Sequence, residues 1–144
     1  MAISSAICNS FKQEILVEGH NFTNGTDQFK LALYTSSASL GASTTAYSTS
    51  NEITNTSGSA YTAGGKNLTS VTPTLDGSTA VCDFGDISFT SASFTANGCL
   101  IYNSTNSNKA VCVVAFGGDK TVSNGTFTIQ FPAAGASTAI VRIA

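Results

Sequence analysis

The sequence has no tryptophan, a single histidine and few charged side chains. Among 144 residues there are six Lys or Arg and eight Asp or Glu, so that only 10% of the chain is charged, against roughly 25% in ordinary globular domains. The cations are isolated from one another, which argues against nucleic-acid binding, because that function needs clustered positive charge. A surface with so few charges repels other proteins only weakly, and this favours a protein that packs against others.

The patterns typical of metal and redox sites are also missing. None of the four cysteines forms a CxxC pair, and His20 alone cannot complete a standard zinc site. We therefore expect no metal and no cofactor. We also expect four reduced cysteines that pack as small apolar side chains: Cys8, Cys82, Cys99 and Cys112.

Long apolar runs are absent from the sequence. No segment approaches the roughly 20 apolar residues that a membrane-spanning helix needs. The opening segment, MAISSAICNSFKQ, lacks the basic and apolar regions of a signal peptide. We expect no association with a membrane.

The sequence does contain a series of short β-strand patterns. Strands are predicted near residues 28–35, 67–74, 79–84, 87–89, 98–103, 110–116, 126–131 and 139–143. Asp76-Gly77 predicts a hairpin turn, and the segment 110–116, apolar on both faces, predicts a strand that is central in its sheet or covered on both sides. About eight short strands with frequent turns predict a single all-β domain over residues 1–144, a β-sandwich or jelly roll. An up-and-down barrel is the main alternative.

Two segments depart from the strand pattern. Residues 1–27 predict an N-terminal arm with a short helix over 11–18, capped by Ser10 and ended by Gly19. Three apolar residues should dock this helix on the sheet: Phe11, Ile15 and Leu16. Residues 36–60 form a long polar excursion of mostly Ser, Thr, Ala and Asn. A connection of this length usually makes contact with something.

The apolar and aromatic side chains in and beside these two segments are the candidate partner contacts. They are Ile3, Ile7, Tyr34, Tyr47, Ile53 and Tyr61. Tyrosine suits this role because it buries a large area at low entropic cost. The tyrosines could equally anchor the excursion to its own domain, and the sequence leaves both readings open.

No catalytic constellation is visible in the sequence. His20 follows the predicted helix, where a histidine usually packs or hydrogen-bonds locally. Asp83 and Asp86 flank a Phe-Gly pair and fit neither a calcium loop nor a glycosidase pair. Gly64-Gly65-Lys66 lacks the spacing of a phosphate-binding loop. We therefore expect a binding or structural protein rather than an enzyme.

Four motifs follow one another in the first half of the chain: Ser10–Leu16 (SFKQEIL), His20-Asn21-Phe22, Phe29–Thr35 (FKLALYT) and Tyr61–Gly65 (YTAGG). In this order they resemble small virion structural proteins of tailed bacteriophages. Within that class the chain is most similar to capsid decoration, or cement, proteins. The resemblance implies a β-sandwich or jelly roll, made in the bacterial host cytoplasm, that binds the exterior of the major capsid protein lattice as a dimer or trimer. Residues 1–10 and 36–59 are then the expected lattice contacts.

Two other functions remain open at this stage. One is a tail, neck or fibre component of the same virion, although the repeats and coiled segments common in fibres are absent. The other is a carbohydrate-binding β-sandwich, which usually presents exposed Trp or stacked Tyr, and this chain has no Trp.

Overall fold

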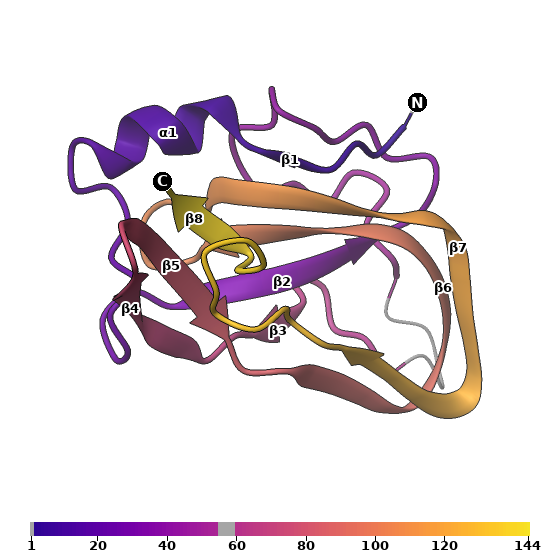
Figure 1. Ribbon diagram of the computed structural model, residues 1–144. Helices are drawn as coiled ribbons and strands as arrows, with labels where there is room; N and C mark the ends of the chain where they lie inside the picture. The colour runs from indigo at the N-terminus through magenta and orange to yellow at the C-terminus, as the bar shows by residue number, and fades with distance from the viewer. Residues whose placement is uncertain (1, 55–59) are drawn as a thin grey trace.

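The computed structural model describes residues 2–54 and 60–144, and most of these residues lie in β-strands (Figure 1). The one helix among the described residues is α1 (Asn9–Ile15), which is far too short to cross a membrane. The strands are β1 (Ala6–Ile7), β2 (Phe29–Tyr34), β3 (Lys66–Asn67), β4 (Ser70–Asp76), β5 (Thr79–Phe84), β6 (Ile87–Asn103), β7 (Lys109–Ile129) and β8 (Val141–Ile143). The prediction of an all-β fold with one short N-terminal helix is confirmed.

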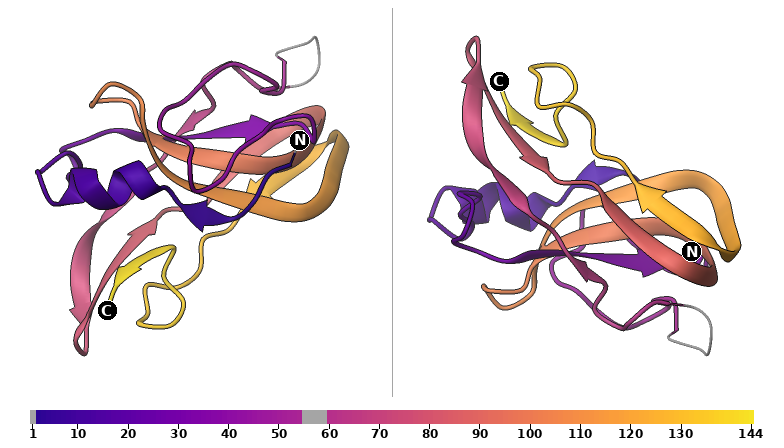
Figure 2. Two further views of the ribbon diagram at one scale, coloured as in Figure 1. Left: turned by 90° about the horizontal axis from the view of Figure 1, so that it is seen from above. Right: turned by 90° about the horizontal axis from the view of Figure 1, so that it is seen from below.

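The strands form two antiparallel sheets. One has five strands in the order β1-β7-β6-β2-β3, and the other has three in the order β4-β5-β8. Figure 2 shows the β4–β5 hairpin and β8 at one end of the molecule, with the bend of β6 and β7 at the opposite end. The predicted turn at Asp76-Gly77 is confirmed, since Gly77 adopts a φ of 62° between β4 and β5.

Strands β6 and β7 form one long, bent hairpin. Their pairing runs from Asn103↔Lys109 to Ile87↔Ile129 with several register shifts. The sequence predicted each of them as two separate short strands, because Ser, Thr and Gly are frequent between the apolar parts. In the structure these polar residues continue the ladder, and the hairpin bends at Gly117-Gly118, where both residues have positive φ. We call residues 109–116 of β7 its first arm and residues 120–129 its return arm.

Burial is greatest where β2, β6 and the first arm of β7 lie side by side. Phe29 and Leu31–Leu33 are fully buried, and the rings of Phe22 and Phe29 stack with centroids 4.4 Å apart. As predicted, the first arm of β7 lies inside its sheet, with β6 on one side and β1 on the other. Its residues 110–113 are buried, and the next three are half-buried.

The predicted strand at 67–74 is two strands in different sheets. β3 pairs with β2, whereas β4 pairs with β5. Between them Leu68 is buried and donates its backbone N–H to the carbonyl of Phe29 at 2.9 Å. The chain therefore passes from one sheet to the other at this point, a long-range event that no local pattern encodes.

The helix differs from its prediction at both ends. It begins two residues earlier, at Asn9, and Ser10 lies inside it with its Oγ buried and without a hydrogen-bond partner, so Ser10 is not the cap. It ends at Ile15. In the turn that follows, the Gly19 N–H donates to the carbonyl of Glu14 at 2.7 Å. Leu16, the C-cap residue, is 83% exposed, so it does not dock the helix on the sheet as predicted.

Candidate functional site

The N-terminal arm and the polar excursion meet and form one continuous surface. Leu40 accepts a hydrogen bond from Ser4 N–H at 2.9 Å and donates its own N–H to Ala2 at 3.1 Å. Asn9 N–H bonds to Ala42 at 2.8 Å. In Figure 1 both segments run along the upper side of the molecule. We call residues 2–10 and 36–54 the arm–loop surface; Met1 and residues 55–59, also part of the predicted contact segments, lie outside the described residues.

The arm–loop surface presents no charge to the outside. Its single charged residue is Glu52, whose side chain is buried with only 6% of the residue exposed. The exposed positions are occupied by Ser, Thr, Ala and Asn. Such short side chains lose little rotamer entropy when a partner covers them, and no ion has to be desolvated. These properties suit a surface that forms an extensive contact with another protein.

The carboxylate of Glu52 holds the excursion in place. Its Oε1 accepts a hydrogen bond from the Tyr47 hydroxyl at 2.6 Å, and its Oε2 accepts from the Tyr61 hydroxyl at 2.5 Å and from Gly64 N–H at 2.8 Å. Hydrogen bonds to an ionised acceptor are stronger than neutral ones. One side chain therefore ties the middle of the excursion to its closing segment.

The tyrosines continue this anchoring. The Tyr34 hydroxyl donates to the carbonyl of Ser48 at 2.7 Å, and the Tyr47 ring stacks on Tyr102 with centroids 4.6 Å apart. Burial, together with the nearby Glu52 carboxylate, raises the pKa of Tyr34, Tyr47 and Tyr61 above the ordinary tyrosine value. For the same reasons the pKa of Tyr102 rises to about 12. The hydroxyls therefore stay protonated and able to donate.

The structure corrects most of the predicted contact residues. Four of the six are buried in their own chain and are not available to a partner: Ile3, Tyr34, Ile53 and Tyr61. In a segment so poor in apolar residues, these side chains are the ones that gain most from burial against the sheet. For the tyrosines, the structure favours the anchoring alternative. Ile7 and Tyr47 are half-buried, and Tyr47 is an anchor as well.

The sequence reasoning missed Glu52. The signal was available, because Glu52 is the one charged residue in the long neutral stretch between Lys30 and Lys66. A lone carboxylate among three tyrosines suggests a buried acceptor. The partners themselves could not be read from the sequence.

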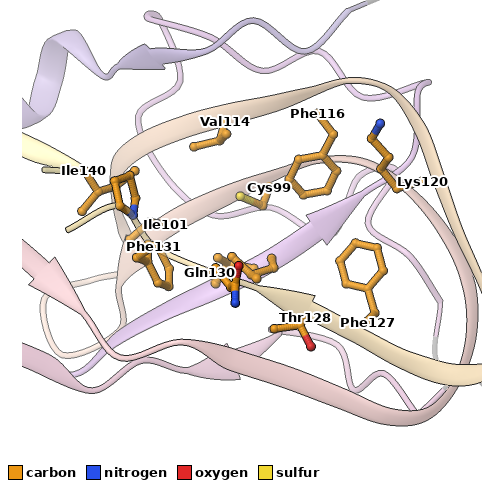
Figure 3. Close-up of a pocket in the computed structure, with 13 residues that line it drawn as sticks. Cys99, Ile101, Val114, Phe116, Lys120, Phe127, Thr128, Gln130, Phe131 and Ile140 are labelled. Carbon is orange, nitrogen blue, oxygen red and sulfur yellow. The ribbon is translucent and has the colours of Figure 1, made fainter. Parts of the chain in front are cut away.

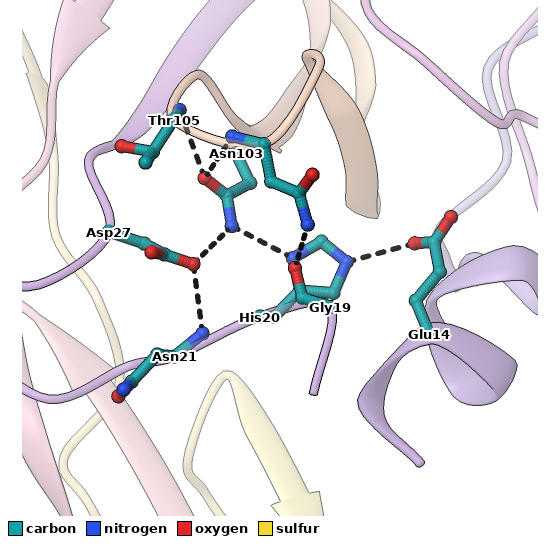
Figure 4. Close-up of polar contacts among 8 residues, drawn as sticks. Glu14, Gly19, His20, Asn21, Asp27, Asn103 and Thr105 are labelled. Atoms are coloured by element: carbon teal, nitrogen blue, oxygen red, sulfur yellow. Dashed lines mark hydrogen bonds and ion pairs between the residues drawn. The ribbon is translucent and has the colours of Figure 1, made fainter. Parts of the chain in front are cut away.

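A second polar cluster surrounds His20 (Figure 4). Its Nε2 lies 2.8 Å from a carboxylate oxygen of Glu14, and its Nδ1 lies 3.1 Å from the side-chain amide of Asn103. Asn103 is fully buried, and its amide also donates to Asp27 at 2.8 Å. As predicted, His20 is hydrogen-bonded locally. The sequence gave no signal for the role of Asn103.

The hydrogen bonds of Asn103 define which ring nitrogen of His20 carries the proton. Its Oδ1 accepts from the backbone N–H groups of Thr105 and Asn106, at 3.1 and 3.2 Å. Its nitrogen must therefore be the donor toward His20 Nδ1. The Nε2–H of the imidazole then donates to Glu14. The cluster joins the N-terminal arm to the turn between β6 and β7, which is a structural role.

An apolar cavity of about 560 Å³ opens between the two arms of β7 (Figure 3). Its walls include Val114 and Phe116 from the first arm, and Phe127 and Ile129 from the return arm. The other lining residues are Leu31, Cys99, Ile101, Lys120, Thr128, Gln130, Phe131, Pro132 and Ile140. Lys120 is the single charged residue among them, and none of these lining residues carries a carboxylate or an imidazole.

The four cysteines are free, as predicted, and three of them are buried. Burial raises the pKa of Cys8 and Cys82 to about 11 and that of Cys99 to about 12. Such thiols are poor nucleophiles and poor metal ligands, because both roles require the thiolate. Within residues 2–54 and 60–144, no group of three or more His, Cys, Asp or Glu side chains could hold a metal ion.

No family model matches this chain, and no curated protein or solved structure shows significant similarity to it.

Proposed function

We propose that this protein is a capsid decoration protein of a tailed bacteriophage, a homo-oligomer that binds the outer surface of the major capsid protein lattice and stabilises the head. It would be made in the host cytoplasm and reside on the exterior of the virion. The observation that carries the proposal is the arm–loop surface, which is continuous, uncharged and held in one conformation by the buried Glu52.

A surface of this kind suits binding to a repeating lattice. The excursion is already fixed to the sheet by backbone hydrogen bonds. The N–H of Thr35 donates to the carbonyl of Asn51, and the N–H of Tyr47 donates to the carbonyl of Asn108, both at 2.9 Å. Binding therefore costs little ordering of the loop. Each copy needs only a modest free energy of binding, because many linked copies on one shell act together.

Two further features support a structural role. The chain resembles small phage virion proteins in its motifs at residues 10–22, 29–35 and 61–65. Moreover, the buried side chains of His20 and Glu52 are both held in local hydrogen bonds. A tail, neck or fibre component of the same virion is the alternative, and it would use the same surface on a different partner. A carbohydrate-binding function is less well supported.

The direct test is a near-atomic cryo-EM map of the particle that contains this protein. We expect density for it at regular positions between capsomers, with residues 2–10 and 36–54 against the shell. Density at the portal or tail instead would refute the decoration role and favour the alternative.

A biochemical test uses heads that lack the protein. Purified wild-type protein should co-sediment with them, whereas Ser43→Lys and Thr49→Lys should bind at least about tenfold more weakly, because each buries an unpaired charge in the contact. Both positions are exposed on the arm–loop surface. Thr74→Lys, at an exposed position on β4, is the matched control and should bind normally. Equal binding by all variants would exclude this surface as the contact.

A further inference from the structure

The apolar cavity between the two arms of β7 has the size and lining of a small-molecule site. Its volume is about 560 Å³, and ligand pockets typically measure roughly 300–1,000 Å³. Among its lining residues Leu31 and Ile101 are fully buried, whereas Phe116, Phe127 and Phe131 are only half-buried. The chain itself leaves these rings incompletely covered, so an apolar molecule that fills the space would be stabilised by their burial.

Lys120 lies on the same face of the hairpin as the buried side chains. It is opposite Ala96 in the β6–β7 ladder, and residues directly opposite each other share a face. Ala96 is fully buried, and Val122, two residues further along, is opposite the buried Phe94. No other charged residue occurs in the return arm, 120–129. Lys120 is therefore the one cation on the apolar side of this arm.

No carboxylate in the described part of the chain pairs with Lys120. The single ion pair among the described residues joins His20 and Glu14. Asp119 precedes Lys120 and so points to the opposite face, where its Oδ1 accepts a hydrogen bond from the Asn97 amide at 2.9 Å. A positive charge beside an apolar cavity, without an anion of its own, is complementary to an anionic group on a ligand.

The charge stands at one end of the cavity only. In Figure 3, Lys120 lies beside Phe116 and Phe127, whereas Phe131 and Ile140 lie at the other end. A molecule with one anionic group and an extended apolar tail would match both ends. Sugars and nucleotides need several convergent hydrogen-bonding groups, and these walls are predominantly apolar.

We propose that this cavity binds a fatty-acid-like molecule, an unbranched alkyl chain with a single carboxylate. The carboxylate pairs with the Lys120 ammonium, and the tail lies between the two arms of β7. Because Lys120 is exposed, the ion pair stays hydrated and contributes modestly, and most of the affinity comes from the tail. This inference goes beyond the proposed lattice contact and is independent of it, since that contact uses the arm–loop surface.

Isothermal titration calorimetry of the purified 144-residue chain with decanoate tests the proposal. Decanoate should bind saturably, with a dissociation constant below about 1 mM. Octanoate has two methylenes fewer and should bind about fifteenfold more weakly. Decyltrimethylammonium carries the opposite charge on the same tail and should bind at least about tenfold more weakly. The proposal is overturned if decanoate does not bind saturably, or if the cation binds as well as decanoate.

Removal of the charge tests the role of Lys120. Lys120→Met keeps the aliphatic stem and should weaken decanoate binding about threefold to fivefold. Lys109→Met, on the same strand but outside the cavity lining, is the matched control and should bind decanoate normally. Equal decanoate affinity in the wild type and Lys120→Met would refute the assigned ligand class.

Filling the cavity tests the location of the tail. Val114→Phe adds a ring to the cavity wall and should weaken decanoate binding at least about tenfold. Val71→Phe, at an exposed position on β4, is the matched control. Circular dichroism checks that each variant is folded, and undiminished binding by folded Val114→Phe would overturn the proposal. If Val114→Phe does not fold, Lys120→Met decides, because its position is exposed.

Discussion

Replacing Glu52 by alanine should release the polar excursion and destabilise the whole protein. The carboxylate accepts three hydrogen bonds, from the Tyr47 and Tyr61 hydroxyls and from Gly64 N–H. Each hydrogen bond to a charged group contributes about 1.5–3 kcal/mol, and a buried donor left unpaired costs about 1–3 kcal/mol. Tyr47 is half-buried and can turn to water, whereas Tyr61 and Gly64 are buried. We therefore expect Glu52→Ala to lower the free energy of unfolding by about 3–5 kcal/mol.

Glu52→Gln separates the role of charge from that of shape. The amide keeps one oxygen acceptor, and the tyrosine hydroxyls can rotate to accept from its nitrogen. We expect a smaller loss of about 1–2 kcal/mol. Asp119→Ala removes an exposed carboxylate with one side-chain partner and should change stability by less than about 0.5 kcal/mol.

The assay is urea unfolding followed by far-UV circular dichroism, because the chain has no tryptophan for fluorescence. Hydrogen exchange in native buffer should show faster exchange in residues 36–54 of Glu52→Ala than in β2 or β6. A loss of less than about 1 kcal/mol would refute the reasoning. So would an exchange increase spread evenly over the chain, because the carboxylate would then not be a local anchor.

Three further predictions concern backbone strain, buried amides and alkaline stability. Gly65→Ala should lower the free energy of unfolding by more than about 4 kcal/mol or prevent folding, because the new Cβ would lie 1.8 Å from a carbonyl oxygen of β2. Gly117→Ala has open space around it and should lower the free energy of unfolding by about 1 kcal/mol in the same urea assay. Asn103→Ala should cost about 3 kcal/mol, because its buried side chain makes four hydrogen bonds, and a loss below about 1 kcal/mol would contradict that role. Burial raises the pKa of Cys99 and of Tyr102 to about 12 each, so these groups ionise at lower pH in the unfolded chain. Stability should therefore hold up to about pH 9, fall above it by about 1.4 kcal/mol per pH unit as Cys99 ionises in the unfolded chain, and fall more steeply above about pH 10, where Tyr102 does the same. Tyrosinate absorbance should appear together with unfolding, and a gradual titration of the folded protein near pH 10 would contradict this.

The sequence predicted the strands whose signals are local. Residues 79–84 were predicted with their observed bounds, and 28–35 to within one residue at each end, because alternation and turn residues mark both. The segments 90–97 and 117–125 were read as connections, since they are rich in Ser, Thr, Asn and Gly. In the structure they are strand, because the backbone ladder between β6 and β7 continues through them whatever the side chains are. The bend and bulges that make this possible depend on pairing across the hairpin.

The candidate site was only partly predictable. Composition indicated residues 1–10 and 36–59 as candidate contact segments, and the structure joins their described parts into one surface through Ser4 and Leu40. Which side chains face outward could not be deduced, because the Tyr61 hydroxyl donates to the Glu52 carboxylate and the Tyr34 hydroxyl to the carbonyl of Ser48, and these partners approach the tyrosines only in the folded chain. Exposed aromatic residues were expected, whereas the exposed surface consists of the small residues between them.

The pairing of β1 with β7 determines the order in which the chain can complete its fold. Ala6 pairs with Val113, and the Ser5 hydroxyl accepts the N–H of Ala115, so the first residues must wait for strands made near the end of synthesis. Contacts so distant in sequence form slowly, because the intervening chain must be closed into a loop first. The β6–β7 hairpin is local and can form early, whereas the N-terminal arm can dock only after β7 is in place. During synthesis, the part of the arm–loop surface formed by the N-terminal arm is therefore completed only after β7 has been made.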